Sequence, residues 1–206
     1  DALRLFEKEH DNLRLALEWS YSEAPAQEDF RLCGAMHRFW FTHGYLAEGR
    51  QWCARILAKG APATPTVEYV RAVNAAGSLA WHQTDFSAAR PLLEQSLALS
   101  RALDDRWGLA RVLNNLGCLA IEQGDYPAAR TLFEESLALW RELGDRRGAA
   151  GLLGNLALVA YECDNLVAAR PLAQESLTLA REVADQGRVA DALSILGNIA
   201  RDQGDL

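Results

Sequence analysis

The amino-acid sequence repeats with a period of 40 residues. Copies begin at Asn74, Asn114 and Gly154, and a fourth begins at Ser194 and runs to Leu206. Residues that recur between the first two copies include Gly77, Ala88, Ala89, Arg90 and Leu97, which return as Gly117, Ala128, Ala129, Arg130 and Leu137. Self-similarity of this length is typical of a solenoid, in which each unit buries its apolar face against its neighbours. Such a fold presents a surface, so the repeat favours binding over catalysis.

Each copy is predicted to form two helices. Residues 106–122 carry apolar and small residues at helical spacing, and residues 126–143 do the same. Gly124 lies between them, where a positive φ would end the first helix. Pro127 stands in the first turn of the second helix, where a missing N–H costs little. Asp145 is placed to cap the next helix. The pattern therefore predicts antiparallel helix pairs.

Small residues recur inside these predicted helices. Gly77 and Gly117 lie in the middle of the first helix of their copies, although glycine there costs about 0.5–1 kcal/mol relative to alanine. Their recurrence predicts the close approach of a neighbouring backbone, with the Ala88-Ala89 and Ala128-Ala129 pairs of the second helix nesting against it.

These marks resemble the tetratricopeptide repeat. The residues that carry the resemblance in the second copy are Leu116, Gly117, Ala120, Gly124, Tyr126, Ala129, Phe133 and Ser136. The resemblance implies an all-α fold, a right-handed superhelix (α-α solenoid) of antiparallel helix pairs. The copies depart from the family pattern, because arginine replaces the usual closing proline and the repeat is longer than the common length of about 34 residues. In the third copy Ala157 replaces glycine and Leu166 replaces the aromatic residue.

The repeat register predicts the domain organisation. Residues 1–59 are expected to hold a capping helix, 3–22, and a divergent first repeat with helices near 30–42 and 46–58. Residues 60–66 form a Pro-containing linker, and residues 67–206 form the repeat array. The capping helix would cover the end of the first repeat with Leu5, Leu13, Ala16, Leu17 and Trp19. The last helix, 190–203, lacks a following partner, which predicts fraying or self-association.

The opening segment has a second resemblance. Residues 7–19, followed by Arg38-Phe39-Trp40 and by residues 44–50, look like the region after the nucleotide-binding domain of bacterial STAND-type signalling ATPases, which include LuxR-type and SARP-type transcription regulators. The resemblance covers residues 1–60. It implies that the chain is part of a larger protein and that an ATPase domain lies upstream.

Composition and motifs argue against other classes of function. The net charge of −7 disfavours direct contact with nucleic acid. No run of 18 apolar residues and no signal peptide is visible, so a cytoplasmic location is expected. No GxxxxGK[ST] loop, HExxH motif or Ser-His-acid spacing is found, so we expect no enzyme activity, no cofactor and no metal site. Cys33, Cys53, Cys118 and Cys163 have no ligand spacing, and we expect reduced, buried thiols.

The concave face is the expected binding site. In tetratricopeptide arrays the first helix of each pair lines this face, which places the following residues there: Arg31, Arg38, Phe41, Arg71, Asn74, Ser78, Trp81, His82, Arg111, Asn114, Cys118, Ile121, Glu122, Leu158, Tyr161 and Glu162. Arg31, Arg71 and Arg111 recur in register beside an apolar track. Guanidinium groups next to aromatic rings suit an extended peptide with acidic and apolar side chains. The alternative is that these residues only solvate the groove or support neighbouring helices.

Another arginine series, Arg50, Arg90, Arg130 and Arg170, is expected to be structural, with pairs at i, i+4 along the second helices. The leading functional hypothesis is a sensor or interaction domain of a STAND-type regulator that binds a protein, a peptide or a small inducer. The second hypothesis is a free-standing scaffold that gathers partner proteins.

Overall fold

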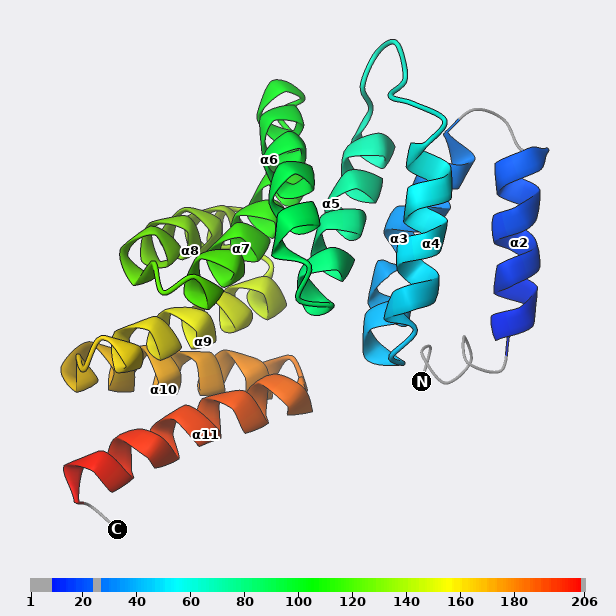
Figure 1. Ribbon diagram of the computed structural model, residues 1–206. Coiled ribbons are helices and arrows are strands. Elements are labelled where there is room, and N and C mark those ends of the chain that lie inside the picture. Colours follow the sequence, from blue (N-terminus) through cyan, green and yellow to red (C-terminus); the bar gives the residue numbers. More distant parts are fainter. Residues whose placement is uncertain (1–8, 24–26, 205–206) are drawn as a thin grey trace. The chain divides into compact units, whose positions relative to one another are not determined.

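The computed structural model describes residues 9–23 and 27–204, and these contain ten α-helices (Figure 1). From α5 onward the helices are joined by short turns, whereas residues 58–66 form a longer loop between α4 and α5. The helices are α2 (His10–Ser22), α3 (Glu28–Thr42), α4 (Leu46–Leu57), α5 (Val67–His82), α6 (Phe86–Ala102), α7 (Arg106–Glu122), α8 (Tyr126–Glu142), α9 (Arg146–Glu162), α10 (Leu166–Glu182) and α11 (Gln186–Gln203). The described residues contain no β-strand. The predicted all-α class is confirmed, and the α11 helix begins four residues before its predicted start.

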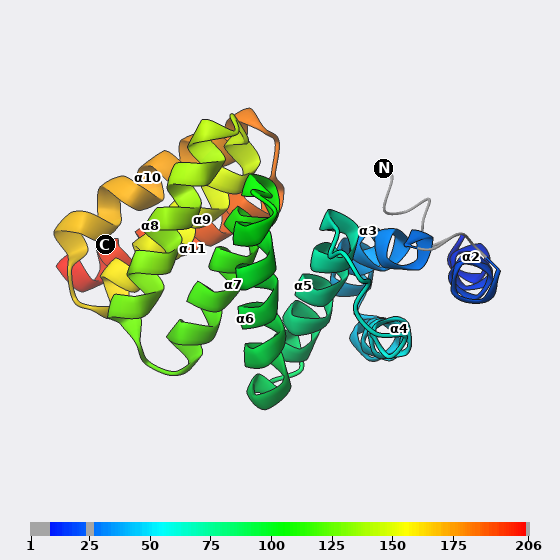
Figure 2. The same ribbon diagram turned by 90° about the horizontal axis from the view of Figure 1, so that it is seen from above.

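The chain divides into two compact units, residues 1–108 and 109–206, which are described separately. In the first unit α3 packs against α4 and α5, and α5 packs against α6. In the second unit α9 packs against α8, α10 and α11. The first helix of each pair is called here an A helix and the second a B helix. The A helices α3 and α9 each contact their own B helix and the next A helix. Figure 2 shows α2 and α4 nearly end-on, with α3 close to both. The predicted boundary at 60–66 stays a prediction.

Local chemistry explains where the helices begin. The side chains of Asp85, Asp125, Asp145 and Asn165 each accept a hydrogen bond from the backbone N–H three residues later, at 2.8–3.1 Å. Each such cap stabilises a helix start by about 1 kcal/mol. The predicted cap at Asp145 is therefore confirmed.

The turns between helices keep one backbone conformation even where glycine is absent. Gly124 ends α7 at a φ of 73°, as predicted. Thr84 and Asp164 hold the same place in the neighbouring copies, with φ of 59° and 56°. Residues with a Cβ pay roughly 1–2 kcal/mol in this left-handed region. Packing of the helix pair therefore imposes the left-handed conformation of the turn. Glycine lowers the free-energy cost of that conformation but is not required for it.

Side chains, rather than backbone, fill the space beside the recurrent glycines. A Cβ at Gly77 would lie 2.9 Å from the side chain of Leu93. A Cβ at Gly117 would overlap the ring of Phe133, which is fully buried. The prediction that a backbone approaches these glycines is wrong, because the B helix instead inserts a large side chain at that level.

Buried serines hold the B helices to the A helices at a second level. The hydroxyls of Ser96, Ser136 and Ser176 donate to backbone carbonyls 26 residues earlier, at 3.4, 2.7 and 2.8 Å. All three serines are almost fully buried. A buried hydroxyl is tolerated when it is hydrogen-bonded, and a small side chain lets the two helices approach closely.

Helix α2 covers the first repeat only in part. Leu17 is fully buried and Leu13 packs against the core of the first unit, as expected for a cap. Trp19, however, is 56% exposed, so its assignment to the buried face is wrong. Leu5 lies outside the described residues. Helix α2 therefore has one apolar side in the core and a second apolar side, Leu15 and Trp19, in solvent.

Candidate functional site

The A helices of the first unit bring an aromatic group to their shared face. The ring of Phe41 on α3 stacks on His82 of α5, with centroids 4.3 Å apart and an interplanar angle of 29°. Trp81 lies against His82 at 4.1 Å. Phe41 is 48% exposed, whereas burial lowers the pKa of His82. The three rings form an apolar platform that is partly open to solvent and carries no charge near neutral pH.

Arginines on the same two helices have different surroundings. Arg38 on α3 is exposed. Arg31 pairs with Glu28 on its own helix at 2.9 Å, which reduces its net charge toward a ligand. The guanidinium of Arg71 on α5 lies over the ring of Trp107, 4.8 Å from its centroid. Arg38 and Arg71 are therefore the groove candidates of this unit that an acidic ligand could meet.

Two other groove candidates in the first unit are withdrawn from solvent. Asn74 is only 6% exposed, and Ser78 is buried with its hydroxyl 3.0 Å from Nε2 of His37. Ser78 therefore lies between α3 and α5 rather than above them. Sequence register alone assigned both residues to the groove, but helix packing withdraws both side chains into the interior.

In the second unit the A helices share a row of amides. Asn155 on α9 donates from Nδ2 to Oδ1 of Asn114 on α7 at 2.9 Å and lies 3.9 Å from Sγ of Cys118. Asn114 in turn lies 3.5 Å from Oδ1 of Asn115. Asn114 and Asn155 are half-buried, so part of each amide still faces outward. An amide can donate and accept, which suits a peptide backbone.

Arg188 on α11 was missed by the sequence reasoning. The arginine series Arg31, Arg71 and Arg111 falls on Gly151 in the next copy, where a Cβ would lie 3.2 Å from the guanidinium of Arg188. Arg188 thus occupies the place that the glycine leaves open. It also pairs with Asp191 at 3.6 Å.

The signal for Arg188 was present in the sequence. The two preceding copies have glycine at the position equivalent to Arg188, namely Gly108 and Gly148. At Gly148 a Cβ would overlap the ring of Trp140, whereas the next copy has Ala180 in place of the tryptophan. Trp140 and Gly148 in one copy thus correspond to Ala180 and Arg188 in the next. The small side chain of Ala180 leaves the space that the larger side chain of Arg188 needs.

Of the remaining candidates in the second unit, Tyr161 and Ile121 lie near the C-terminal ends of α9 and α7, whereas Arg111 lies in the first half of α7. The hydroxyl of Tyr161 donates to Oδ2 of Asp202 at 2.6 Å, and this hydrogen bond raises the pKa of Tyr161. Arg201 lies 3.4 Å from the same hydroxyl. Ile121 and Arg111 are half-buried. Tyr161 is thus tied to α11, and only part of its ring is available to a ligand.

The second arginine series has the structural role that was predicted. Arg90 and Arg130 pair with Glu94 and Glu134 at 3.3 and 2.7 Å. Arg50 instead reaches the next copy and pairs with Asp85 at 2.8 Å. These pairs neutralise the guanidinium groups on the B helices or hold adjacent copies together.

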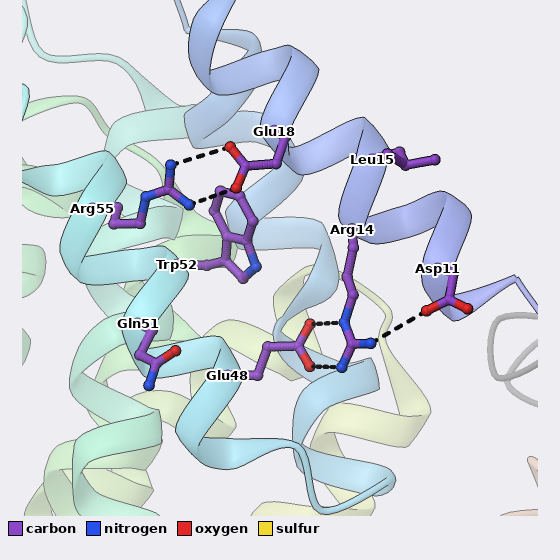
Figure 3. A pocket seen from close by; sticks show the side chains of 8 residues that line it. All are labelled: Asp11, Arg14, Leu15, Glu18, Glu48, Gln51, Trp52 and Arg55. Atoms are coloured by element: carbon purple, nitrogen blue, oxygen red, sulfur yellow. Dashed lines mark hydrogen bonds and ion pairs between the residues drawn. The ribbon is translucent and has the colours of Figure 1, made fainter.

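A cavity of about 730 Å³ lies away from the A-helix face, between α2 and α4 (Figure 3). Two bidentate ion pairs span it. Arg14 donates to both carboxylate oxygens of Glu48 at 3.0 and 2.8 Å, and Arg55 donates to Glu18 at 2.8 and 3.1 Å. These hydrogen bonds lower the pKa of both carboxyl groups. Trp52 lies between the two pairs, so the cleft has an apolar floor and neutralised walls.

Metal sites, membrane-spanning helices and cysteine burial were the remaining expectations from the sequence. No group of three or more His, Cys, Asp or Glu residues in the described part of the chain could hold a metal ion. Within the same residues no helix is long and apolar enough to span a membrane. The expectation that all four cysteines are buried is wrong, because Cys163 is exposed and Cys118 is half-buried.

The structure is similar to several solved structures. The BtubC (BKLC) structure from P. vanneervenii matches 100% of this chain and 85% of its own length, with a TM-score of 0.76 and 15% identity. A Rap protein complexed with competence and sporulation factor matches 98% of this chain and 62% of its own length, with a TM-score of 0.72 and 14% identity. These identities show the fold alone.

A third similar structure is described as a STAND protein with a tetratricopeptide repeat sensor, PH0952 from Pyrococcus horikoshii. It matches 87% of this chain with a TM-score of 0.69 and 13% identity, and the chain spans only 28% of its length. No curated protein matches the sequence.

Family models settle the nature of the repeats. Residues 69–142 match one tetratricopeptide-repeat model, and residues 150–187 match another. Together these segments cover more than half of the chain and contain helices α5–α10 almost entirely. The chain therefore belongs to the tetratricopeptide-repeat family.

Proposed function

We propose that this chain is a binding domain whose A-helix faces hold an extended segment of a partner protein or peptide. One observation carries the proposal: Phe41 stays 48% exposed while it stacks on His82, with Arg38 exposed one turn earlier on the same helix. Burying a half-exposed aromatic ring on binding is favourable, and a nearby guanidinium suits a carboxylate. The preferred ligand combines acidic and apolar side chains.

The second unit supports the same kind of ligand. Asn114 and Asn155 can donate to and accept from the backbone of an extended chain, and the guanidinium of Arg188, which also pairs with Asp191, lies next to Gly151, one turn before Asn155. A small inducer with a carboxylate would satisfy the same groups. Nucleic acid is a poor candidate, because the chain has a net charge of −7.

The finer proposal is a sensor role in a cytoplasmic bacterial STAND-type ATPase or transcription regulator. Residues 1–60 resemble the segment after the ATPase domain of such proteins, and a similar solved structure is described as carrying a tetratricopeptide repeat sensor. Occupancy of the A-helix faces would then be passed to an ATPase domain upstream.

The test of the sensor role uses the full-length gene product. Candidate partners are first captured with the wild-type segment. A candidate that an Arg71→Glu/Arg111→Glu variant captures equally well does not bind through the A-helix faces and is not used further. Nucleotide hydrolysis by the full-length protein is then measured with and without that partner. A change in the hydrolysis rate supports the sensor, whereas binding with unchanged hydrolysis excludes it.

A free-standing scaffold is the second candidate. The similarity to BtubC, which extends over 85% of that chain, favours it, because a repeat array of this size can then exist without a large additional domain. A gene product with no nucleotide-binding domain that brings two partner proteins into one complex would support the scaffold.

We also propose self-association through α11. Ala110 and Leu113 of α7, and Ala150 and Leu153 of α9, are all almost fully buried. The residues in register on α11 are Ala190 and Leu193, and both are exposed. A Cβ at Gly197 would meet no atom within 4 Å, whereas the equivalent glycines are covered by a B helix. This uncovered face is the surface on which two copies would meet.

A further inference from the structure

Two cysteines from different helices meet in the core of the first unit. Cys33 is on α3 and Cys53 is on α4, and their Sγ atoms lie 3.0 Å apart. Both residues are completely buried. The pair is surrounded by the main apolar cluster of the unit, which includes Phe30, Trp40 and Ile56.

The two Sγ atoms need to move only a short distance before a covalent bond can form between them. A disulfide needs an S–S distance of about 2.05 Å, so the two sulfur atoms must approach by roughly 1 Å. Rotation about two χ1 angles can supply such a shift without moving a helix axis. The helices that carry the cysteines already pack against each other.

We propose that Cys33 and Cys53 form a disulfide site that fastens α3 to α4 when the chain folds in the presence of a disulfide oxidant. The oxidant class is a small disulfide such as oxidised glutathione. One cysteine thiolate attacks the oxidant, forms a mixed disulfide and releases one glutathione thiolate. The second cysteine attacks the protein-side sulfur and releases the other. The two protons of the cysteine thiols end on the two glutathione thiolates, so atoms and electrons balance.

Burial decides when this exchange takes place. Close contact with Cys53 and burial raise the pKa of Cys33, so its reactive thiolate is scarce in the folded chain. A glutathione mixed disulfide also has no room in a core whose cysteines are fully buried. The bond therefore forms while α3 and α4 are still open, and the finished core then shields it from reductants.

The bond would act on the helix that carries part of the proposed ligand face. Helix α3 holds Arg38 and Phe41, and a covalent link to α4 would limit its movement relative to its B helix. Closing a loop of this length favours the folded state by reducing the freedom of the unfolded chain. The free cysteines of the structure correspond to the reduced form.

The test measures the disulfide equilibrium in a Cys118→Ser/Cys163→Ser background, so that only one pair can form. The unfolded, reduced chain is refolded in a series of glutathione redox buffers, quenched with acid and analysed by mass. The same series in concentrated urea gives the value for the unfolded chain. We expect the equilibrium constant for the disulfide to be roughly 100-fold higher under folding conditions, because loop closure and folding reinforce each other.

An equilibrium constant under folding conditions no higher than that in urea overturns the proposal. A Cys33→Ala variant in the same background is the control and should lose no hydrogen mass in any buffer. If the serine background fails to fold, wild-type protein refolded in the same buffers is digested with trypsin without reduction. A cross-linked pair of peptides 32–38 and 51–55 supports the site, and its absence when other cysteine pairs form contradicts it.

Discussion

The guanidinium of Arg188 occupies the space next to Gly151, within 3.2 Å of the position that a Cβ there would take. The two residues come from consecutive A helices, α9 and α11. Arginine recurs at the Gly151 position in three earlier copies, so the missing cation is replaced from the neighbouring helix. A basic group is thus retained on the A-helix face of the second unit beside Asn155.

Substitution by alanine should change stability in opposite directions at Gly117 and Gly197, which occupy equivalent positions in two copies of the repeat. At Gly117 the added methyl group overlaps the buried ring of Phe133, and we expect Gly117→Ala to destabilise the fold by about 1–3 kcal/mol. At Gly197 the space is open, and we expect Gly197→Ala to stabilise α11 by about 0.5–1 kcal/mol. Urea denaturation followed by circular dichroism, with hydrogen exchange of α11, measures both. Effects of the same sign would contradict the packing.

Charge reversal on the A-helix faces should abolish binding of an acidic ligand. A labelled peptide in which Glu alternates with Leu serves as the probe. Arg71→Glu in the first unit and Arg111→Glu in the second should each weaken binding at the face of its own unit at least tenfold, because reversal of a guanidinium–carboxylate contact costs roughly 2–5 kcal/mol. Fluorescence anisotropy measures the affinity. Arg181→Glu, on a B helix, makes the same change in net charge and should bind like wild type. Equal affinity for all variants would exclude the face.

The half-buried His82 should make stability dependent on pH. Burial lowers the pKa of His82 below its ordinary value of 6.5, so the unfolded chain binds a proton more readily than the folded chain. Stability should therefore fall as pH drops below about 6.5, and the loss should level off below the folded pKa. His82→Phe keeps an aromatic ring against Phe41 but cannot titrate. Denaturation at pH 7.5 and 5 should show a smaller loss for this variant than for wild type.

The cysteines outside the first unit should differ in reactivity. Burial raises the pKa of Cys118 to about 12, which leaves almost no thiolate at pH 8. Cys163 is exposed. Iodoacetamide at pH 8 should modify Cys163 at least roughly 100-fold faster than Cys118, since the rate follows the thiolate fraction. Peptide mass spectrometry over time gives both rates, and comparable rates would show that α7 opens freely.

Self-association should depend on the uncovered face of α11. Leu193 is 47% exposed, and Leu193→Glu should shift the chain toward monomer by placing a charge on an apolar contact. Sedimentation equilibrium at increasing concentration gives the mass. Val167→Glu is the control, because this residue is 87% exposed on α10. A wild-type mass equal to the monomer at every concentration contradicts the proposal.

Sequence by itself determined the repeat unit of this protein. The bounds of α7 and α8 were predicted to within one residue, because helical periodicity, the Asp125 cap and Gly124 are local signals. The pairing of Arg90 and Arg130 with glutamates four residues on was predictable for the same reason. These interactions lie within one helix or one turn, so they depend little on the rest of the chain.

Only the tertiary structure decided which side chains meet across the A helices. Copies align in sequence at a step of 40, but neighbouring A helices make their contacts at a step of 41, as in the Asn114–Asn155 and Tyr161–Asp202 hydrogen bonds. Ridges of one helix fit between those of the next, which shifts the contacts away from strict register. Packing between helices also decided that Asn74 lies inside, that Trp19 lies outside, and that Cys33 on α3 meets Cys53 on α4. Local periodicity specifies a helix face, whereas packing between helices specifies its neighbours.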